Sequence, residues 1–491
     1  MAEKNTADIG FEKQIWNAAC VLRGNMDASE YKGVVLGLIF LKYISDRFEA
    51  RYQELVDEGY GMEEDRDEYT SEGIFFVPAG ARWSDVSAKA HDPEIGQVID
   101  DAMRAIEKEN VRLKDILPKN FARPELDKRR LGEVVDLFTN IKMIEHGSEK
   151  DILGRTYEYC LSMFAEQEGK RGGEFFTPAD VSELLTRLGT VGKKEINKVY
   201  DPACGSGSLL LKAEKVLGRD AVRNGFFGQE INITTYNLCR INMFLHDIEF
   251  DKFDIACEDT LTNPQHWDDE PFELIVSNPP YSIKWAGDEN PLLINDPRFA
   301  PAGVLAPKSK ADLAFIMHSL AWLASNGTAA IVCFPGIMYR GGAEQKIRKY
   351  LVDNNFIDCI IQLPSNLFFG TSIATCIMVL KKGKTDNKVL FIDASSECVK
   401  VTNNNKLTPE NINKIVDTFA QRAEEAHFSH LAEYSEVQEN DYNLSVSTYV
   451  EAKDTREKID IVKLNAEIAQ IVARENELRA AIDQIVAEIE G

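Results

Sequence analysis

The four residues Asn278-Pro279-Pro280-Tyr281 are the ones best suited to chemistry, and they follow the apolar run 272–276. Two consecutive prolines fix the backbone at the carboxyl end of the expected strand, so the polar groups around them point outward. An amino group on an aromatic ring is a poor nucleophile because its lone pair is delocalised into the ring. The Asn278 side-chain oxygen and the Pro279 carbonyl are two acceptors that would bind both hydrogens and bring the nitrogen toward sp3 geometry.

We therefore expect this motif to bind a planar amino group, with the Tyr281 ring stacked on the attached base. For these four residues alone, an Asn-capped turn punctuated by proline is the alternative interpretation.

A glycine-rich turn lies upstream, where the short apolar run 198–200 is followed by Asp201-Pro202-Ala203-Cys204-Gly205-Ser206-Gly207-Ser208. Gly205 and Gly207 let the backbone pass close to a ligand, and the helix expected after them offers free N–H groups. A third glycine and a phosphate-binding lysine are missing, so neither the dinucleotide fingerprint nor the P-loop pattern is complete. The turn favours a cofactor without a pyrophosphate.

Carboxylates end the next two expected strands. The run 225–229 leads to Glu230, which is able to accept hydrogen bonds from both hydroxyls of a ribose. After a helix expected over 232–247, the run 253–257 leads to Asp259, a candidate acceptor for the amino group of an adenine ring. Each acid taken alone is more simply a solvated strand end. Their appearance in order at successive strand ends favours a nucleoside site.

Together these segments resemble the S-adenosylmethionine-dependent amino-methyltransferases of DNA, whose fold is a Rossmann-like α/β fold with a seven-stranded, mostly parallel sheet. Residues 173–178, before the first strand, and 310–316, after the proline motif, look like the modification subunits of type I restriction-modification systems. The resemblance extends to residues 11–16, 363–368 and 442–445. It therefore covers nearly the whole chain.

The resemblance also implies which residues hold S-adenosyl-L-methionine and the target base. The methionine part of the cofactor would be surrounded by two sets, Glu174, Phe175, Phe176, Thr177, Pro178 and Ala179, and Ser206, Gly207 and Ser208. Asp201, Gly205 and Asp259 would also bind the cofactor. Glu230 would bind the ribose, and Asn278, Pro279, Pro280 and Tyr281 would hold the target adenine. On this interpretation the methyl group passes to adenine N6 by in-line displacement, without a metal ion or a covalent nucleophile. Because N6 is paired inside a duplex, the adenine must first rotate out of it.

The charge of the chain limits how it meets DNA. The 491 residues carry a formal net charge of −24 with 44% hydrophobic content. Duplex affinity comes mainly from neutralised phosphates, so this balance argues against an independent nucleic-acid binder. The family resemblance implies partners that supply the contacts: a specificity subunit, a restriction subunit and a second copy of the chain. Basic stretches at 119–130 and 308–310 are local candidates for the duplex DNA backbone, although the first is more simply a charged surface.

Cysteine usage and hydropathy indicate a cytoplasmic enzyme. Nine cysteines without a C-x-x-C pair predict neither a disulfide framework nor a zinc site, and they fit a reducing cytoplasm. The first residues lack signal-peptide character. The longest apolar run, 33–41, is too short to cross a bilayer, so we expect no membrane span.

Changes in hydrophobic period divide the chain into four expected parts. Residues 1–150 show helical spacing and form an N-terminal helical domain. Residues 151–400 alternate strands and helices as a doubly wound catalytic domain, with later strands at 328–334, 357–363 and 374–381. Residues 401–454 are expected to be an irregular linker, and 455–491 a C-terminal coiled-coil-type helix.

The tail helix carries an apolar stripe at alternating three- and four-residue steps, with Glu475 as its polar position: Ile461, Leu464, Ile468, Ile471, Leu478, Ile482, Ile485 and Ile489. A single helix cannot bury such a stripe by itself. It either packs on its own domain or docks on the coiled coil of a partner, and the resemblance makes the specificity subunit that partner.

Two other functions stay open from the residues. A methyltransferase of a protein glutamine amide would use the same two acceptors, although such enzymes are usually compact and lack a helical domain and a heptad tail. A non-catalytic assembly subunit would not need Asn278 and Tyr281 intact. The choice of adenine N6 over cytosine N4 rests on the family resemblance.

Overall fold

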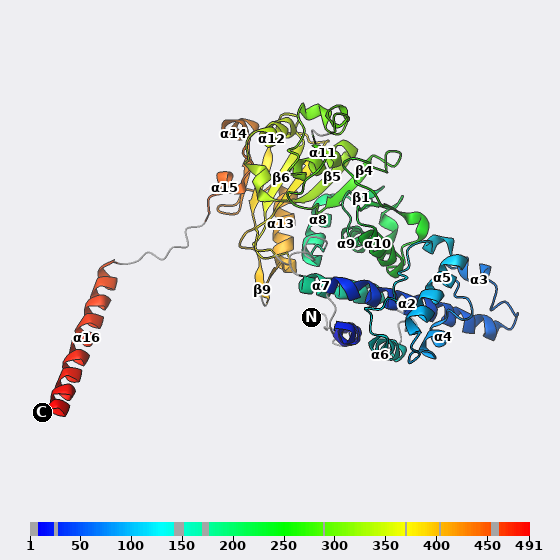
Figure 1. Ribbon diagram of the computed structural model, residues 1–491. Coiled ribbons are helices and arrows are strands. Elements are labelled where there is room, and N and C mark those ends of the chain that lie inside the picture. The colour runs from blue at the N-terminus through cyan, green and yellow to red at the C-terminus, as the bar shows by residue number, and fades with distance from the viewer. Residues whose placement is uncertain are drawn as a thin grey trace. The chain divides into compact units, whose positions relative to one another are not determined.

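The computed structural model of the protein describes residues 8–23, 28–141, 152–168, 176–287, 290–368, 371–401, 404–452 and 461–491. The chain divides into two compact units, Met1–Val450 and Glu451–Gly491. Figure 1 shows the course of the chain, with helices first, a sheet covered by helices next, and a helix at the end.

Helices fill the first part of the chain, as its hydrophobic spacing predicts. They are α1 (Asp8–Ala19), η1 (Cys20–Arg23), α2 (Ala28–Glu58), α3 (Asp67–Thr70), α4 (Trp83–Ser87), α5 (Ile95–Glu109), η2 (Val111–Leu113), α6 (Lys128–Thr139) and α7 (Ile152–Glu168). Helix α5 buries Ile99, Met103 and Ile106, which are spaced three and four residues apart on one face. Helix α6 begins where the Asp127 carboxylate accepts from the N–H groups of Arg129 and Arg130.

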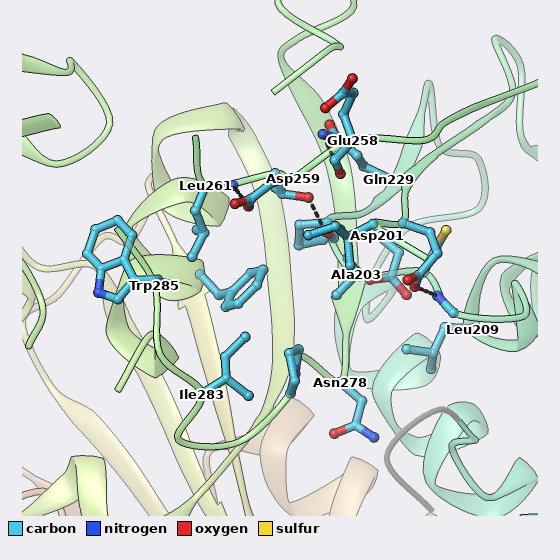
Figure 2. Close-up of a pocket in the computed structure, with 18 of the residues that line it drawn as sticks. Asp201, Ala203, Leu209, Gln229, Glu258, Asp259, Leu261, Asn278, Ile283 and Trp285 are labelled. Carbon is cyan, nitrogen blue, oxygen red and sulfur yellow. Dashed lines mark hydrogen bonds between the residues drawn. The ribbon is translucent and has the colours of Figure 1, made fainter. Parts of the chain in front are cut away.

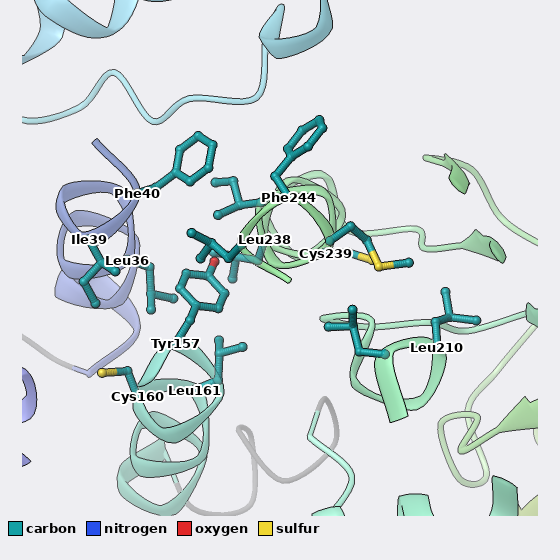
Figure 3. Close-up of a cluster of buried hydrophobic side chains, with 14 of the residues drawn as sticks. Leu36, Ile39, Phe40, Tyr157, Cys160, Leu161, Leu210, Leu238, Cys239 and Phe244 are labelled. Atoms are coloured by element: carbon teal, nitrogen blue, oxygen red, sulfur yellow. The ribbon is translucent and has the colours of Figure 1, made fainter. Parts of the chain in front are cut away.

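The first helices share one hydrophobic core with the helices on the sheet. Figure 3 shows side chains of α2, α7 and α10 (Ile233–Leu245) converging, among them Leu36, Phe40, Tyr157, Leu238 and Phe244. The Phe75 ring lies 5.1 Å from the Phe244 ring, which extends this contact. The N-terminal helices therefore belong to the same compact unit as the sheet.

The main sheet has nine strands among the described residues, in the order β11-β8-β6-β7-β5-β4-β1-β2-β3. The strands are β1 (Val199–Asp201), β2 (Phe226–Gln229), β3 (Phe253–Ala256), β4 (Phe272–Ser277), β5 (Leu323–Cys333), β6 (Ile357–Gln362), β7 (Cys376–Lys381), β8 (Val389–Asp393) and β11 (Ser429–Ala432). Strand β7 is antiparallel to β5 and β6, and β11 is antiparallel to β8. The other neighbours are parallel.

The expected number of seven strands is too low, because β8 and β11 extend the sheet beyond β6. Strand β11 is a four-residue edge strand, Ser-His-Leu-Ala, with too few residues to show alternation. The expectation of an irregular linker over 401–454 is also wrong. That stretch contains β11, the helices α13 (Pro409–Gln421), α14 (Tyr434–Glu439) and α15 (Val446–Tyr449), and strand β10 (Asn404–Lys406), which pairs with β9 (Val399–Val401). Thr408 caps α13, and this helix buries the apolar residues of one face although many of its other residues are polar.

Helices cover both faces of the sheet, because successive strand residues alternate between two cores. Val276 belongs to the core under α8 (Ala179–Gly189), α9 (Ser208–Leu217), α10 and α13, whereas Ile275 belongs to the core under α11 (Asp312–Trp322) and α12 (Ala343–Asp353). Short 3-10 turns complete the chain: η3 (Arg219–Ala221), η4 (Phe250–Lys252), η6 (Leu293–Asn295), η7 (Ala300–Ala302) and η8 (Pro335–Met338). Strands β4, β1, β2 and β3 are neighbours and parallel, so their carboxyl ends meet at one edge.

The last helix, α16 (Ile461–Glu490), is a single helix of 30 residues. Its eight stripe residues are exposed over between 44% and 79% of their surface. Residues 455–460, which the sequence also predicts to be helical, lie outside the described part of the chain. Among the described helices, none is both long enough and apolar enough to cross a membrane.

Candidate active site

A cavity of about 170 Å³ lies at the carboxyl ends of β4, β1, β2 and β3. Figure 2 shows Glu258 and Asp259 at one end of it and Asn278 at the other, with Trp285 at its side. Of the residues expected in the site, it is lined by Thr177, Asp201, Gly205, Ser208, Glu230, Asp259, Asn278 and Pro280. The structure thus brings together three of the sequence motifs at one place.

The glycine-rich turn passes from β1 to α9 in a conformation that requires glycine. Gly205 and Gly207 have φ angles of +54° and +81°, and α9 begins directly after them. A Cβ atom on Gly207 would lie 2.8 Å from Cys239 Sγ. The turn therefore has no room for a side chain at Gly207, and Gly205 lines the cavity. Ser206 and Gly207 support it from behind rather than lining it.

Asp201 is buried at the base of the cavity. Its Oδ1 accepts from Ser277 Oγ at 2.8 Å and from the Ala203 N–H at 3.0 Å. Its Oδ2 is buried without a hydrogen-bond partner among the described residues, and Ser206 Oγ is in the same situation. Burial raises the pKa of Asp201 to about 7. Asp201 lines the cavity, so its Oδ2 is available to a polar ligand there, whereas Ser206 does not line it.

Glu230 follows β2 and is held by backbone groups on both of its oxygens. Oε2 accepts from the Gly205 N–H at 3.1 Å, and Oε1 accepts from the Asn232 N–H at 2.8 Å. Burial nevertheless raises the pKa of Glu230. Each oxygen keeps a further lone pair, so this fixed carboxylate is able to accept from two hydroxyls.

Asp259 begins a tight loop after β3. Its Oδ1 accepts from the Leu261 N–H at 2.9 Å and its Oδ2 from Thr262 Oγ1 at 2.8 Å, while its carbonyl accepts from the Asn263 N–H at 2.7 Å. The carboxylate is half-buried at the cavity wall.

Asn278 directly follows β4, and two hydroxyl groups fix its amide. Asn278 Nδ2 donates to Thr177 Oγ1 at 3.1 Å, and the Tyr281 hydroxyl donates to Asn278 Oδ1 at 2.6 Å. The next N–H, of Ser282, donates to both carboxylate oxygens of Asp312 at 3.1 and 3.0 Å. The motif is therefore held from α11 as well as from the segment before α8.

Tyr281 reaches Asn278 through its hydroxyl. Its ring packs against the hydrophobic core and lines neither this cavity nor the second cavity that adjoins it. Burial raises the pKa of its hydroxyl well above the usual value, so the hydroxyl stays a donor to Asn278.

A second cavity of about 490 Å³ adjoins the first, and Thr177 and Ser208 line both. The expected cofactor residues Phe176, Pro178 and Ala179 line only this second cavity. Glu174 and Phe175 lie outside the described residues.

Several lining residues have no motif that would reveal them: Gln229, Leu261, Ile283, Trp285 and Phe315. Phe315 falls within the stretch 310–316, which supported the family resemblance, and this was its only signal. Outside the cavity, Asp254, His266 and Asp269 form the one group within the described residues with spacing suited to a metal ion. Both His266 ring nitrogens are already paired there, with Gly228 O and Asp269 Oδ2.

Comparison with known proteins gives the family. The family described as N-6 DNA Methylase matches residues 148–458, and the HsdM N-terminal domain matches residues 11–138. The chain is 42% identical to the type I restriction enzyme MpnII methylase subunit of Mycoplasma pneumoniae, over 98% of this chain and 96% of that protein. The chain belongs to the N-6 DNA methylase family.

Two further relatives agree. The MjaIX methylase subunit of Methanocaldococcus jannaschii is 30% identical over 97% of this chain and 91% of its own length. The crystal structure of a type I restriction-modification methyltransferase subunit from Streptococcus thermophilus is 34% identical, with a TM-score of 0.80, and covers 90% of this chain and 100% of its own. The chain is thus a type I modification subunit, a DNA adenine methyltransferase that uses S-adenosyl-L-methionine, and the two alternative functions are not supported.

The residues of the first cavity fit this cofactor. The fixed Glu230 carboxylate with free lone pairs suits a ribose, and the unpartnered Asp201 Oδ2 suits a polar group of an amino acid. Close backbone approach at Gly205 leaves space for the ligand.

The raised pKa of Asp201 predicts how the methylase responds to pH without added cofactor. The folded protein holds this proton with a pKa of about 7 against a usual value of 3.8. The resulting stabilisation is complete below the unfolded pKa and is lost as pH rises through about 7, by about 4 kcal/mol in all, of which about 3 kcal/mol falls above pH 5. Thermal melts from about pH 5 to pH 8 should show this fall, and Asp201→Asn should flatten it. An equal pH dependence in the variant would contradict the assignment.

Proposed function

We propose that the methylase transfers a methyl group to N6 of an adenine that has rotated out of duplex DNA, with Asn278 holding the amino group. The observation that carries this proposal is the amide of Asn278, fixed between Thr177 and Tyr281 at the rim of the cavity. An amide with a single orientation presents its oxygen in a defined direction, which suits an amino donor.

In this proposal the nucleoside half of the cofactor lies between β2 and β3, with Glu230 on the ribose hydroxyls and Asp259 on the adenine amino group. Asp201 faces its methionine half, toward the place where Thr177 and Ser208 line both cavities. When bound, S-adenosyl-L-methionine supplies a methyl group made electrophilic by its sulfonium.

Asn278 then acts on the target amine. Its Oδ1 has two lone pairs, of which Tyr281 uses one, so the other accepts a hydrogen from N6. The Pro279 carbonyl would accept the second hydrogen. With both hydrogens held by these acceptors, the N6 lone pair would be directed toward the methyl group that the cofactor supplies, and the surplus proton of N6 would leave to water. Fixed acceptors supply orientation without reorganisation at the moment of reaction.

The second cavity is the side from which we propose the target nucleotide enters. It meets the first cavity at Thr177, and its volume of about 490 Å³ leaves room for a nucleotide. Its lining carries both charges, Lys212, Lys215 and Lys406 together with Glu158, Glu166 and Asp180. Stacking of Tyr281 on the base stays a prediction from the sequence.

The partners we propose are a specificity subunit bound through α16, a second copy of the chain, a restriction subunit and duplex DNA. The exposed apolar stripe of α16 supports a helical partner, because eight large apolar residues exposed on one helix are costly in water. Glu475 at one stripe position would select register or partner. The nine cysteines of the sequence include no C-x-x-C pair, which supports placement in the reducing cytoplasm.

Asn278→Ala should abolish methyl transfer while cofactor binding persists. We expect a loss of at least about 1000-fold in kcat, because one acceptor of the amine is removed, with cofactor Kd changed less than about threefold. Tritiated methyl transfer to duplex DNA, with and without co-expressed partners, measures the first quantity and calorimetry the second. Asn354→Ala, at the exposed end of α12, is the matched control and should keep full activity. Full activity of Asn278→Ala would contradict the proposed role of Asn278 as an acceptor for the target amine.

Variants of Thr177 test whether the orientation of the Asn278 amide affects the rate of methyl transfer. Thr177→Val keeps the shape of the side chain but removes the acceptor for Asn278 Nδ2, so kcat should fall about tenfold. Thr177→Ser keeps the hydroxyl and should stay within about twofold of the parent. Steady-state kinetics decide the point. If both variants lose activity equally, the hydroxyl of Thr177 does not orient Asn278.

Removal of residues 455–491 should leave cofactor binding intact and abolish co-purification with the specificity subunit. The pair Leu478→Asp with Ile482→Asp should do the same, because charge in the stripe prevents burial. The control pair, Gln470→Asp with Gln484→Asp, lies off the stripe and should not affect co-purification. Retention of the partner by the truncated chain would refute the docking role of α16.

A further inference from the structure

Arg298 is a buried guanidinium whose five N–H donors are all used. It is 2% exposed and lies in the segment between the Asn-Pro-Pro-Tyr motif and α11. Its donors reach the Thr260 and Leu261 carbonyls at 2.8 Å each, Asp296 Oδ1 at 3.0 Å, Asp296 Oδ2 at 2.7 Å, and His318 Nδ1 at 3.1 Å. A lysine has three donors on one atom and does not match this fork.

The tautomer of His318 follows from these contacts. Arginine only donates, so His318 Nδ1 must carry the lone pair and Nε2 the proton. Nε2 then donates to the Tyr200 hydroxyl at 2.9 Å. Burial, followed by the charge of Arg298, lowers the pKa of His318 well below its usual value, which agrees with a neutral ring. His318 is therefore a fixed acceptor for the last donor of Arg298.

The two carbonyls that Arg298 binds belong to the loop that forms the far wall of the cofactor cavity, residues 258–263. Gln229 holds the rest of this loop, because its Nε2 donates to the Glu258 and Asn263 carbonyls at 3.0 Å each. Thr260 Oγ1 donates to Pro202 O at 2.6 Å. Two buried side chains thus fix four carbonyls of a six-residue loop.

Arg298 also connects this loop to the other side of the cavity. Trp285 lines that side, and it donates from its backbone N–H to Lys308 O at 3.0 Å and from Nε1 to Pro307 O at 3.1 Å. The Phe299 ring, next to Arg298, packs edge-on against the Trp285 ring at 5.4 Å. One segment therefore supports both walls.

We propose that Arg298 is a positioning residue that preorganises loop 258–263 to receive the nucleoside half of the cofactor. The inference rests on the placement of the cofactor proposed above. Stability alone does not account for the arrangement, because a buried charged network is often replaceable by apolar side chains of similar volume. A preformed loop lowers the entropy cost of ordering the loop when the cofactor binds. Loss of Arg298 should therefore weaken the affinity for the cofactor.

Arg298→Lys in the full-length chain is the test. We expect Kd for S-adenosyl-L-methionine and for S-adenosylhomocysteine, measured by calorimetry, to rise about tenfold or more, with kcat at saturating cofactor within about twofold. Arg348→Lys is the matched control, since Arg348 is equally buried and donates to the Tyr442 and Ile337 carbonyls, away from the cavity. It should lower the melting temperature without changing Kd. Equal losses of affinity in both variants, or an unchanged Kd in Arg298→Lys, would overturn the proposal.

A second pair of variants covers the case in which Arg298→Lys does not fold. His318→Asn places an oxygen near the position of Nδ1 and should keep Kd within about threefold, whereas His318→Leu removes the acceptor and should raise Kd further than that. Equal Kd values in the two variants would contradict the role of Arg298. Glu230→Gln tests the proposed cofactor site independently of Arg298. If Glu230→Gln leaves the cofactor Kd unchanged, the proposed placement of the cofactor is wrong. If Glu230→Gln raises Kd but the Arg298 and His318 variants do not, the inference about Arg298 is wrong.

Discussion

The structure depends on the burial of acidic side chains where four parallel strands end. Asp201 and Glu230 both lie out of water, and the pKa of each is raised by that burial. A buried carboxylate is tolerated only where donors reach it. The left-handed conformation of Gly205 brings its N–H to Glu230. This hydrogen bond stabilises both the conformation of the turn and the buried Glu230 carboxylate. The same burial leaves Asp201 with one unsatisfied oxygen, which is a cost to the fold that a polar ligand would relieve.

A second constraint applies at the end of β4, where an amide must have one orientation. Asn278 gains it from Thr177, about 100 positions earlier in the chain, and from Tyr281, three residues later. Asp312 holds the Ser282 N–H from the start of α11. Prolines alone would fix the backbone and leave the side chain free to turn. The catalytic geometry therefore rests on long-range contacts around a rigid local motif.

The sequence predicted what local patterns encode. Strong apolar runs located β1 to β7 within a few residues, and the helix expected over 232–247 is α10 with Asn232 as its cap. Residues Glu230, Asp259 and Asn278 were found because each follows a strand at the edge where parallel sheets bind ligands. Strand β11 was missed because four residues are too few to show alternation. Helix α13 was missed although its buried residues Ile412, Ile415, Val416 and Phe419 recur at helical spacing.

Arg298 and Trp285 carry no sequence signal, since their partners are backbone carbonyls that only the folded chain brings near. For Tyr281 the sequence motif identified the residue, but it did not predict the direction of the ring, which depends on packing against the core.

The division of labour between this chain and its partners follows from energetics. Rotating a base out of a duplex costs a few kcal/mol, which must come from binding DNA. A chain with a net charge of −24 gains little from phosphates, because its average field repels them. A cofactor site held by Gln229 and Arg298, and an amide held by Thr177, spend no binding energy on reorganisation. Under the proposed function, the chain reacts with a base that a partner presents to it, and the exposed stripe of α16 is the surface proposed to bind that partner.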